Sequence, residues 1–215
     1  MSSFSELGGA DTSTMVKEST MTMFAEAQDT VSTAPGFTPE QIEAEIASRL
    51  PEEARASGQP VIVIITGPIC AGKTTLRRQK YASGHVLVDA AQIFIDLGGI
   101  ELAFPSTLLE PMQAVGAEVA RRAVAGRMSI VTEVVGSEFG PVATLINAMK
   151  GAGYKVELVG LTADLEECMV RNANRAQDNV SAYYAEPFQT RWLVKAARMR
   201  PQCTTVWPAS RAGGI

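Results

Sequence analysis

The sequence predicts an α/β protein, a three-layer αβα sandwich built around a five-stranded parallel sheet. Five short segments with strand character alternate with segments of helical pattern, which favours right-handed βαβ crossovers. The first strand, Val61-Ile-Val-Ile-Ile65, is apolar throughout, as is typical of a strand buried on both faces of a parallel sheet. The 215 residues, 46% of them hydrophobic, are enough for one sizeable core and too few for two comfortable domains.

The predicted elements begin at Thr38, which precedes Pro39 and is followed three residues later by Gln41, the pattern of a capping box with proline in the first turn. This pattern starts a helix over 38–50. The remaining elements follow in chain order: strands over 61–65, 85–88, 128–132, 154–160 and 203–207, and helices from near 72, over 108–125, 141–151, 163–175 and 186–199. Residues 1–36, rich in small and polar residues without periodicity, are predicted to be a mobile tail, and 37–215 the folded domain.

Composition argues against several classes of partner. The 19 basic and 23 acidic residues give a net charge of −4, without the basic stripe that neutralises a nucleic-acid backbone. No apolar run approaches the ~20 residues that span a bilayer, and the N-terminus lacks the features of a signal peptide. The three cysteines are too few and too scattered for a disulfide framework or a metal site. We expect a cytoplasmic protein that binds neither membrane nor nucleic acid.

The segment between the first strand and the next helix matches the P-loop pattern, Gly-x4-Gly-Lys-Thr, over Gly67-Pro68-Ile69-Cys70-Ala71-Gly72-Lys73-Thr74. The glycines allow a tight turn whose N–H groups point at phosphate oxygens, and the positive end of the following helix adds to that field. Lys73 would reach the β- and γ-phosphates, Thr74 would coordinate Mg²⁺, and Thr75 would support the helix start. The loop therefore predicts a site for ATP with Mg²⁺.

Other parts of the sequence narrow the class of P-loop protein. A GTPase needs an Asn-Lys-x-Asp motif to read guanine, and the chain contains no Asn-Lys. A ring-forming ATPase needs a helical lid domain, for which the chain has no length left. These observations favour a small-molecule kinase.

From about Phe37 onward the chain resembles the zeta toxin family, whose members are similar to bacterial UDP-N-acetylglucosamine kinases. The resemblance rests on the following segments: the capped helix at Thr38, 61–75, Val86-Leu-Val-Asp89, Gly126-Arg-Met-Ser-Ile-Val-Thr-Glu133, Met149-Lys-Gly-Ala-Gly-Tyr-Lys-Val156 and Cys168-Met-Val-Arg171. Only the P-loop is individually specific. The resemblance implies transfer of the ATP γ-phosphate to a hydroxyl of a nucleotide sugar, toxicity through blocked cell-wall precursor synthesis, and an antitoxin-like partner.

The resemblance also assigns roles to individual residues. Lys73 and Thr74 match the positions that bind ATP and Mg²⁺, and Glu133 and Glu118 match acidic residues of the substrate pocket. Arg171 matches the first of two arginines that neutralise the transferring phosphate.

The chain departs from the family at three places. Where the family follows its substrate glutamate with a glycine-rich turn and a basic residue, this chain has Val134-Val-Gly-Ser137. The family has Asp-x-Asp after the second strand, with the second Asp as catalytic base, whereas this chain has Asp89-Ala90-Ala91. The second phosphate-binding arginine aligns with Tyr184. Either the substrate differs, or neighbouring groups have taken over, or the protein binds ATP with little turnover.

The residues themselves support a site at the carboxyl ends of the strands. Asp89 and Glu133 both end predicted strands, at the sheet edge where ligands of α/β proteins bind. We predict Asp89 as catalytic base and Mg²⁺ ligand, and Glu133 as substrate or metal ligand. Arg171 and Arg175 are four residues apart on one helix face and would clamp the γ-phosphate. The alternative for these arginines is a solvated basic face that pairs with acidic residues at 164, 166 and 167.

Three hypotheses remain open. The first is a kinase that phosphorylates a small hydroxyl-bearing metabolite, with a UDP-sugar as the favoured acceptor. The second is a catalytically weak ATP-binding module that acts through a partner, favoured by Ala91 and Tyr184 at two of the departures. The third is a nucleoside or nucleotide kinase.

Overall fold

The computed structural model describes residues 36–68, 70–98, 106–134, 139–174 and 205–208. The predicted tail over 1–36 lies outside the described residues, apart from Gly36, and so does the predicted helix over 186–199. Arg175 and Tyr184 also lie outside them.

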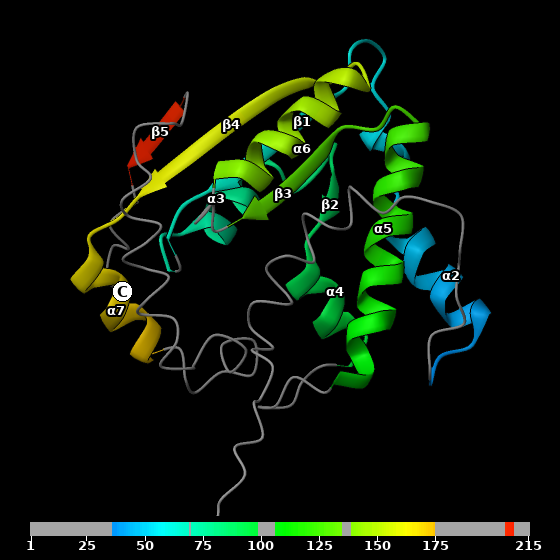
Figure 1. Ribbon diagram of the computed structural model, residues 1–215, viewed down its shortest axis with the longest axis horizontal. Helices are drawn as coiled ribbons and strands as arrows, with labels where there is room; N and C mark the ends of the chain where they lie inside the picture. The colour runs from blue at the N-terminus through cyan, green and yellow to red at the C-terminus, as the bar shows by residue number, and fades with distance from the viewer. Residues whose placement is uncertain (1–35, 69, 99–105, 135–138, 175–204, 209–215) are drawn as a thin grey trace, which may run out of the picture.

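A parallel sheet forms the centre of the described structure (Figure 1). Its strands are β1 (Val61–Thr66), β2 (Val86–Val88), β3 (Ile130–Val134), β4 (Lys155–Thr162) and β5 (Thr205–Pro208). They lie in the order β2-β3-β1-β4-β5, and every neighbouring pair is parallel. The predicted α/β class with a parallel sheet is confirmed.

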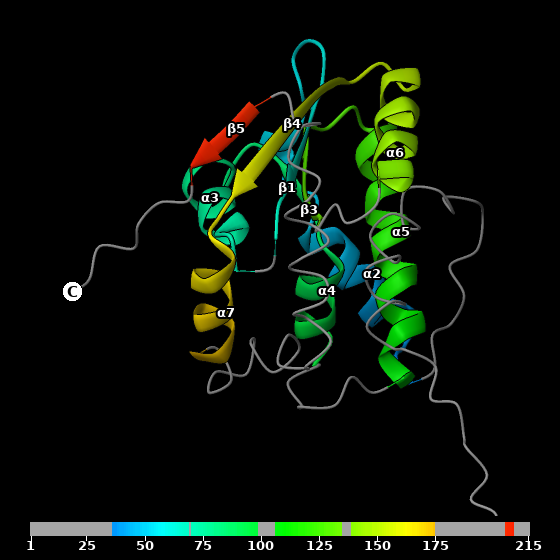
Figure 2. The same cartoon turned by 60° about the vertical axis from the view of Figure 1, so that its left-hand side comes forward.

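Helices cover both faces of the sheet. They are α2 (Pro39–Ser48), α3 (Lys73–Lys80), α4 (Ala90–Asp96), α5 (Leu109–Ala125), α6 (Phe139–Gly151) and α7 (Leu165–Asn174), with short 3₁₀ turns at Glu52–Ala54 and Ser106–Leu108. One buried cluster joins the sheet to α2, α4, α5 and α6, and a second joins its other face to α3 and α7. Figure 2 shows the two groups of helices on opposite sides of the strands.

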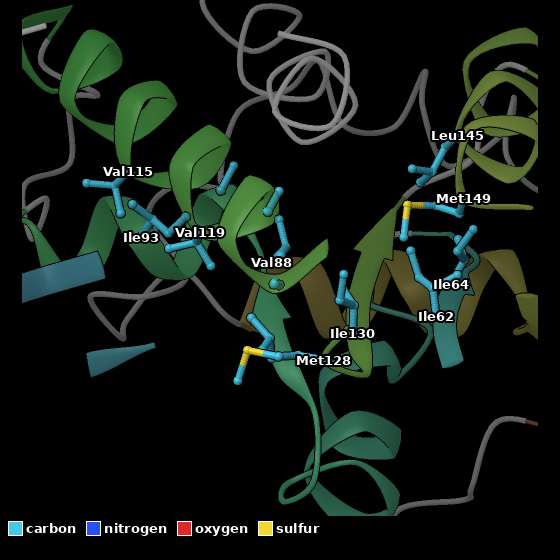
Figure 3. Close-up of a cluster of buried hydrophobic side chains, with 14 of the residues drawn as sticks. Ile62, Ile64, Val88, Ile93, Val115, Val119, Met128, Ile130, Leu145 and Met149 are labelled. Atoms are coloured by element: carbon cyan, nitrogen blue, oxygen red, sulfur yellow. The ribbon is translucent and has the colours of Figure 1, made fainter. Parts of the chain in front are cut away.

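The two clusters follow from the alternation of side chains along the buried strands. Ile62 and Ile64 of β1 point to the larger cluster, where they meet Ile130 of β3 and Met149 of α6 (Figure 3). Val63 and Ile65 point to the other face, toward Leu76 of α3. Because β1 is buried on both faces, it requires apolar residues at every position, and the run Val61–Ile65 provides them.

The start of α2 has the predicted cap. The Thr38 hydroxyl accepts from the Gln41 backbone N–H at 3.2 Å, and the Gln41 side chain accepts from the Thr38 N–H at 2.8 Å. Together these two bonds form the capping box.

Two predictions need correction. No helix was predicted after the second strand, but residues Ala90–Asp96 form α4. Its buried members Ala90, Ile93 and Phe94 lie three and four residues apart on one face. The third strand was predicted over 128–132 and lies over Ile130–Val134, so Glu133 is inside the strand rather than just after it. Met128 instead makes an isolated antiparallel bridge with Arg55 before the strand begins.

The strand order determines where a ligand site can form. From β1 the chain passes through α3 to β2 on one side, and from β3 it passes through α6 to β4 on the other side of β1. The helices that follow the adjacent strands β1 and β3 therefore leave toward opposite faces of the sheet. Such a switch point opens a crevice at the carboxyl ends of the two strands, where α/β proteins bind ligands.

Candidate nucleotide site at the carboxyl edge of the sheet

The loop over residues 67–74 leaves β1 at this switch point and leads into α3. A Cβ atom at Gly67 would lie 2.8 Å from the backbone oxygen of Leu161 in β4, so only glycine fits this approach of the loop to the strand. Gly72 caps α3 with φ +91°, in the left-handed region. Cys70 between them is also left-handed, with φ 63°, and it is buried. The glycine spacing of the sequence pattern therefore corresponds to two positions where a side chain would clash or strain the backbone.

Lys73 lies across its own loop. Its ammonium donates to the backbone oxygens of Gly67 at 3.0 Å and Pro68 at 2.9 Å. The Ala71 N–H donates to the same Pro68 oxygen at 3.2 Å, which closes the turn. The positive charge of Lys73 is therefore held against the loop at the N-terminus of α3.

Glu133 of β3 lies against the first two turns of α3. Its Oε2 accepts from the Thr74 hydroxyl at 2.8 Å, and its Oε1 accepts from Arg77 Nε at 2.6 Å. The side chains of Arg77 and Glu133 are only 10% and 8% exposed. Register explains the meeting, because Glu133 pairs with Ile65, the penultimate residue of β1, just before the loop. Two predicted site residues, Thr74 and Glu133, are thus in direct contact.

Asp89 follows β2 and is the N-cap of α4, where its Oδ1 accepts from the Ala91 N–H at 3.0 Å. Burial, together with the negative charge of Glu133, raises the pKa of Asp89 from 3.8 to about 6. The backbone N–H of Ala91, the charge of Arg77 and the backbone N–H of Gln92 oppose that rise. The two predicted carboxylates are therefore near neighbours at this edge. Ala91, which stands where the family has a second Asp, supplies a backbone donor to the first.

Arg171 of α7 reaches the loop from the other side of β1. Its Nη1 donates to the backbone oxygen of Cys70 at 3.2 Å, and it forms an ion pair with Glu167 one turn earlier. The ion pair with Glu167 is a contact of the kind that the solvated-face alternative predicts, whereas the clamp on the γ-phosphate stays a prediction.

The remaining predicted site residues lie apart from these contacts or outside the described residues. Glu118 of α5 forms ion pairs with Arg121 and Arg122, and Arg122 continues to Glu43 of α2. These contacts tie α5 to α2, and the arginines, Arg121 first, lower the pKa of Glu118 to about 2. Thr75 is exposed in the first turn of α3. Ile69 and Arg175 lie outside the part of the chain that is described.

Arg77 is the residue that the sequence analysis missed. It stands four residues after Lys73, one helical turn further along α3. That spacing was visible in the sequence, but the acidic partner is 56 residues away on β3. An arginine one helical turn after the lysine of the predicted phosphate loop was the signal available in the sequence.

The described residues define the class of the protein: a parallel α/β protein with a glycine-rich loop and two carboxylates at its switch point. The fold is similar to a chain from the PezAT chromosomal toxin-antitoxin system of Streptococcus pneumoniae, with a TM-score of 0.54 and 19% sequence identity over 76% of this chain and 73% of that chain. This likeness confirms, at the level of the fold, the resemblance seen in the sequence. No family model matches the chain, and no curated protein matches its sequence.

A second solved structure, the AvrRxo1-ORF1:-ORF2 complex with ATP, is more distant. It has a TM-score of 0.44 and 16% identity, and the match covers 86% of this chain and 57% of that chain.

Among the described helices, none has the length and apolar character needed to cross a membrane.

Proposed function

We propose that this chain is a P-loop kinase that binds ATP with Mg²⁺ at the 67–74 loop and transfers the γ-phosphate to a hydroxyl group of a small metabolite. The observation that carries the proposal is the convergence of Lys73, Thr74, Glu133 and Asp89 at the carboxyl ends of β1, β2 and β3. A cation, a hydroxyl and two carboxylates are the groups that phosphoryl transfer requires, since it depends mainly on positioning and charge neutralisation.

The residues present fit a magnesium-bound nucleotide. The loop cannot tolerate a side chain at Gly67, and a lysine ammonium already lies against its backbone. The Thr74 hydroxyl donates its proton to Glu133, so its oxygen lone pairs remain to coordinate a cation. Thr74, with Asp89, would hold Mg²⁺, which would supply neutralisation of phosphate charge when bound.

Asp89 is the best candidate for the base. In the proposed step the acceptor oxygen attacks the γ-phosphorus, the bond from that phosphorus to the β–γ bridging oxygen breaks, and ADP leaves. The acceptor proton passes to Asp89, whose pKa of about 6 leaves it ionised at neutral pH while still basic enough to accept a proton. Lys73 and Arg171 would stabilise the negative charge that develops on the phosphate oxygens.

The acceptor and the biological context follow from the resemblance. We infer a hydroxyl of a nucleotide sugar such as a UDP-sugar as the acceptor, a cytoplasmic location, and an antitoxin-like protein as partner. The toxin-antitoxin origin of the similar fold supports this direction. Glu133 would contact either the acceptor or the metal. Because Glu118 is engaged by two arginines, we do not include it in the acceptor site.

The test is an acceptor screen with purified protein, ATP and Mg²⁺, followed by ³¹P NMR for a new phosphate ester. We expect one class of hydroxyl compound to be phosphorylated, and the activity to be lost in Lys73→Ala but kept in Lys150→Ala, which changes an exposed lysine at the end of α6. Consumption of ATP without a new ester in any nucleoside, sugar or nucleotide-sugar reaction would refute the kinase assignment.

The same screen separates the two other hypotheses. Phosphorylation of free nucleosides or nucleotides alone would favour a nucleoside or nucleotide kinase. Tight ATP binding without any ester would favour a binding module that acts through a partner. Asp89→Asn should lower kcat by about 10²-fold to 10⁴-fold, the usual contribution of a general base, while ATP affinity measured in EDTA is kept.

A further inference from the structure

Arg77 forms the most deeply buried ion pair at the site, and the proposed reaction gives it no role. Its guanidinium bonds Glu133 at 2.6 Å, and both side chains are at most one-tenth exposed. Burying two charges carries a large desolvation penalty, and apolar residues of similar volume often stabilise the fold as well or better. Helix packing alone is therefore a weak reason to place an arginine at this position of α3.

The geometry around Glu133 indicates what the arginine does. Arg77 binds one carboxylate oxygen, Oε1, and Thr74 donates to the other, Oε2, at 2.8 Å. With Oε1 fixed by Arg77, the carboxylate cannot rotate freely, so Oε2 stays directed at Thr74. The Thr74 proton then has a defined acceptor, and the lone pairs of its oxygen have a defined direction away from Glu133.

We propose that Arg77 is a positioning residue that fixes Glu133, so that Glu133 orients the Thr74 hydroxyl toward the magnesium ion of the bound nucleotide. This inference rests on the proposed function. Outer groups that orient a metal ligand through hydrogen bonds commonly change metal affinity 10–100-fold when they are mutated. Arg77 does not touch the nucleotide in this arrangement, so it acts only on the part of the affinity that magnesium contributes.

Removal of the guanidinium has a defined consequence. In Arg77→Ala the Glu133 carboxylate would stay in a buried position next to Asp89 without its cationic partner, and repulsion between the two carboxylates would turn it away from Thr74. The loop and Lys73 would remain as they are. Binding of ATP in EDTA should therefore be unchanged, whereas the gain in affinity on adding Mg²⁺ should fall.

The experiment measures the dissociation constant of ATP by calorimetry, with Mg²⁺ and with EDTA, for each variant. We expect Arg77→Ala to reduce the magnesium-dependent gain at least 10-fold, approaching Thr74→Val, with the constant in EDTA within 2-fold of the wild type. Glu133→Gln should give the same loss, and the double variant should be no worse than either single one. Arg78→Ala, which changes the adjacent exposed arginine of α3, is the matched control and should behave as wild type.

Two results would overturn the inference. One is a magnesium-dependent gain in Arg77→Ala that equals the wild-type value. The other is an equal loss of affinity with Mg²⁺ and with EDTA, which would make Arg77 a structural support of the loop. If Arg77→Ala does not fold, as judged by circular dichroism, Arg77→Lys replaces it, and the magnesium-dependent gain should then lie between those of wild type and Glu133→Gln. Wild-type protein that binds no ATP would instead refute the proposed function.

Discussion

Replacing Asp89 with asparagine is expected to stabilise the protein at neutral pH. Folding moves the Asp89 carboxyl away from water and next to Glu133, and its pKa rises from 3.8 to about 6. At about 1.4 kcal/mol for each pKa unit, the free energy of unfolding is about 3 kcal/mol smaller when Asp89 is ionised than when it is protonated. Asparagine carries no charge, and its side-chain oxygen can still accept from the Ala91 N–H and cap α4. We therefore expect the variant to be about 1–3 kcal/mol more stable at pH 8.

The pH dependence of the stability gain in Asp89→Asn tests whether the raised pKa of Asp89 is its cause. The folded protein holds the Asp89 proton more tightly than the unfolded chain, so folding is favoured when the carboxyl is protonated. The contribution of Asp89 is thus fully present below about pH 4 and is lost as the pH rises through about 6. The advantage of Asp89→Asn should be near zero at pH 4 and reach its full value by pH 8.

The assay is urea unfolding followed by circular dichroism at pH 4 and pH 8, in EDTA so that no metal contributes. The matched control is Asp164→Asn, because Asp164 is exposed and its Oδ1 likewise accepts from backbone N–H groups at the start of a helix, those of Glu166 and Glu167. The control should not gain stability with pH. An Asp89→Asn advantage below about 0.5 kcal/mol at pH 8, or one of equal size at pH 4, would refute the reasoning.

Three further substitutions test the structure. Gly67→Ala should lower ATP affinity at least 10-fold in calorimetry, because its methyl group would lie 2.8 Å from the Leu161 oxygen; unchanged affinity would contradict the loop geometry. Tyr154→Phe removes a buried hydrogen bond to the Met128 oxygen at 2.8 Å and should lower the free energy of unfolding in urea by about 1–2 kcal/mol; an unchanged free energy would contradict this bond. Glu118→Gln should lower the free energy of unfolding by about 1–3 kcal/mol at pH 7, and the difference from wild type should shrink as pH falls from about 4 to 2.

Local signals in the sequence were enough to predict the framework. The capping box at Thr38, the apolar run of β1 and the glycine spacing of the 67–74 loop each depend on residues close together in the chain. The short helix α4 was missed although its signal was equally local, because Asp89 was interpreted as a site residue and not also as an N-cap. The same carboxylate serves both purposes in the structure.

The candidate site was predictable only in part, because its electrostatics depend on contacts far apart in the sequence. Glu133 and Asp89 were identified from their places at strand ends, but the sequence gives no measure of their distance from each other. Arg77 and Glu118 show the limit clearly. The partner of Arg77 is 56 residues away. Arg122, which pairs with Glu118, also pairs with Glu43 of α2, 79 residues away. Such pairings follow from the strand order and helix packing rather than from spacing.

The strand order also explains why the site is costly to build. Since β3 lies between β2 and β1, Glu133 pairs with Ile65 on one side, and Asp89 follows directly on Val88, which pairs with Thr132 on the other. Two carboxylates are thereby brought together at a partly buried edge, where burial first, and then the charge of Glu133, raises the pKa of Asp89. A fold selected only for stability would place an apolar or neutral residue at one of these positions. Arg77 pairs directly with Glu133, and its charge only partly offsets the rise in the pKa of Asp89, which stays at about 6. A carboxylate with a raised pKa is what a general base beside a metal-binding hydroxyl requires.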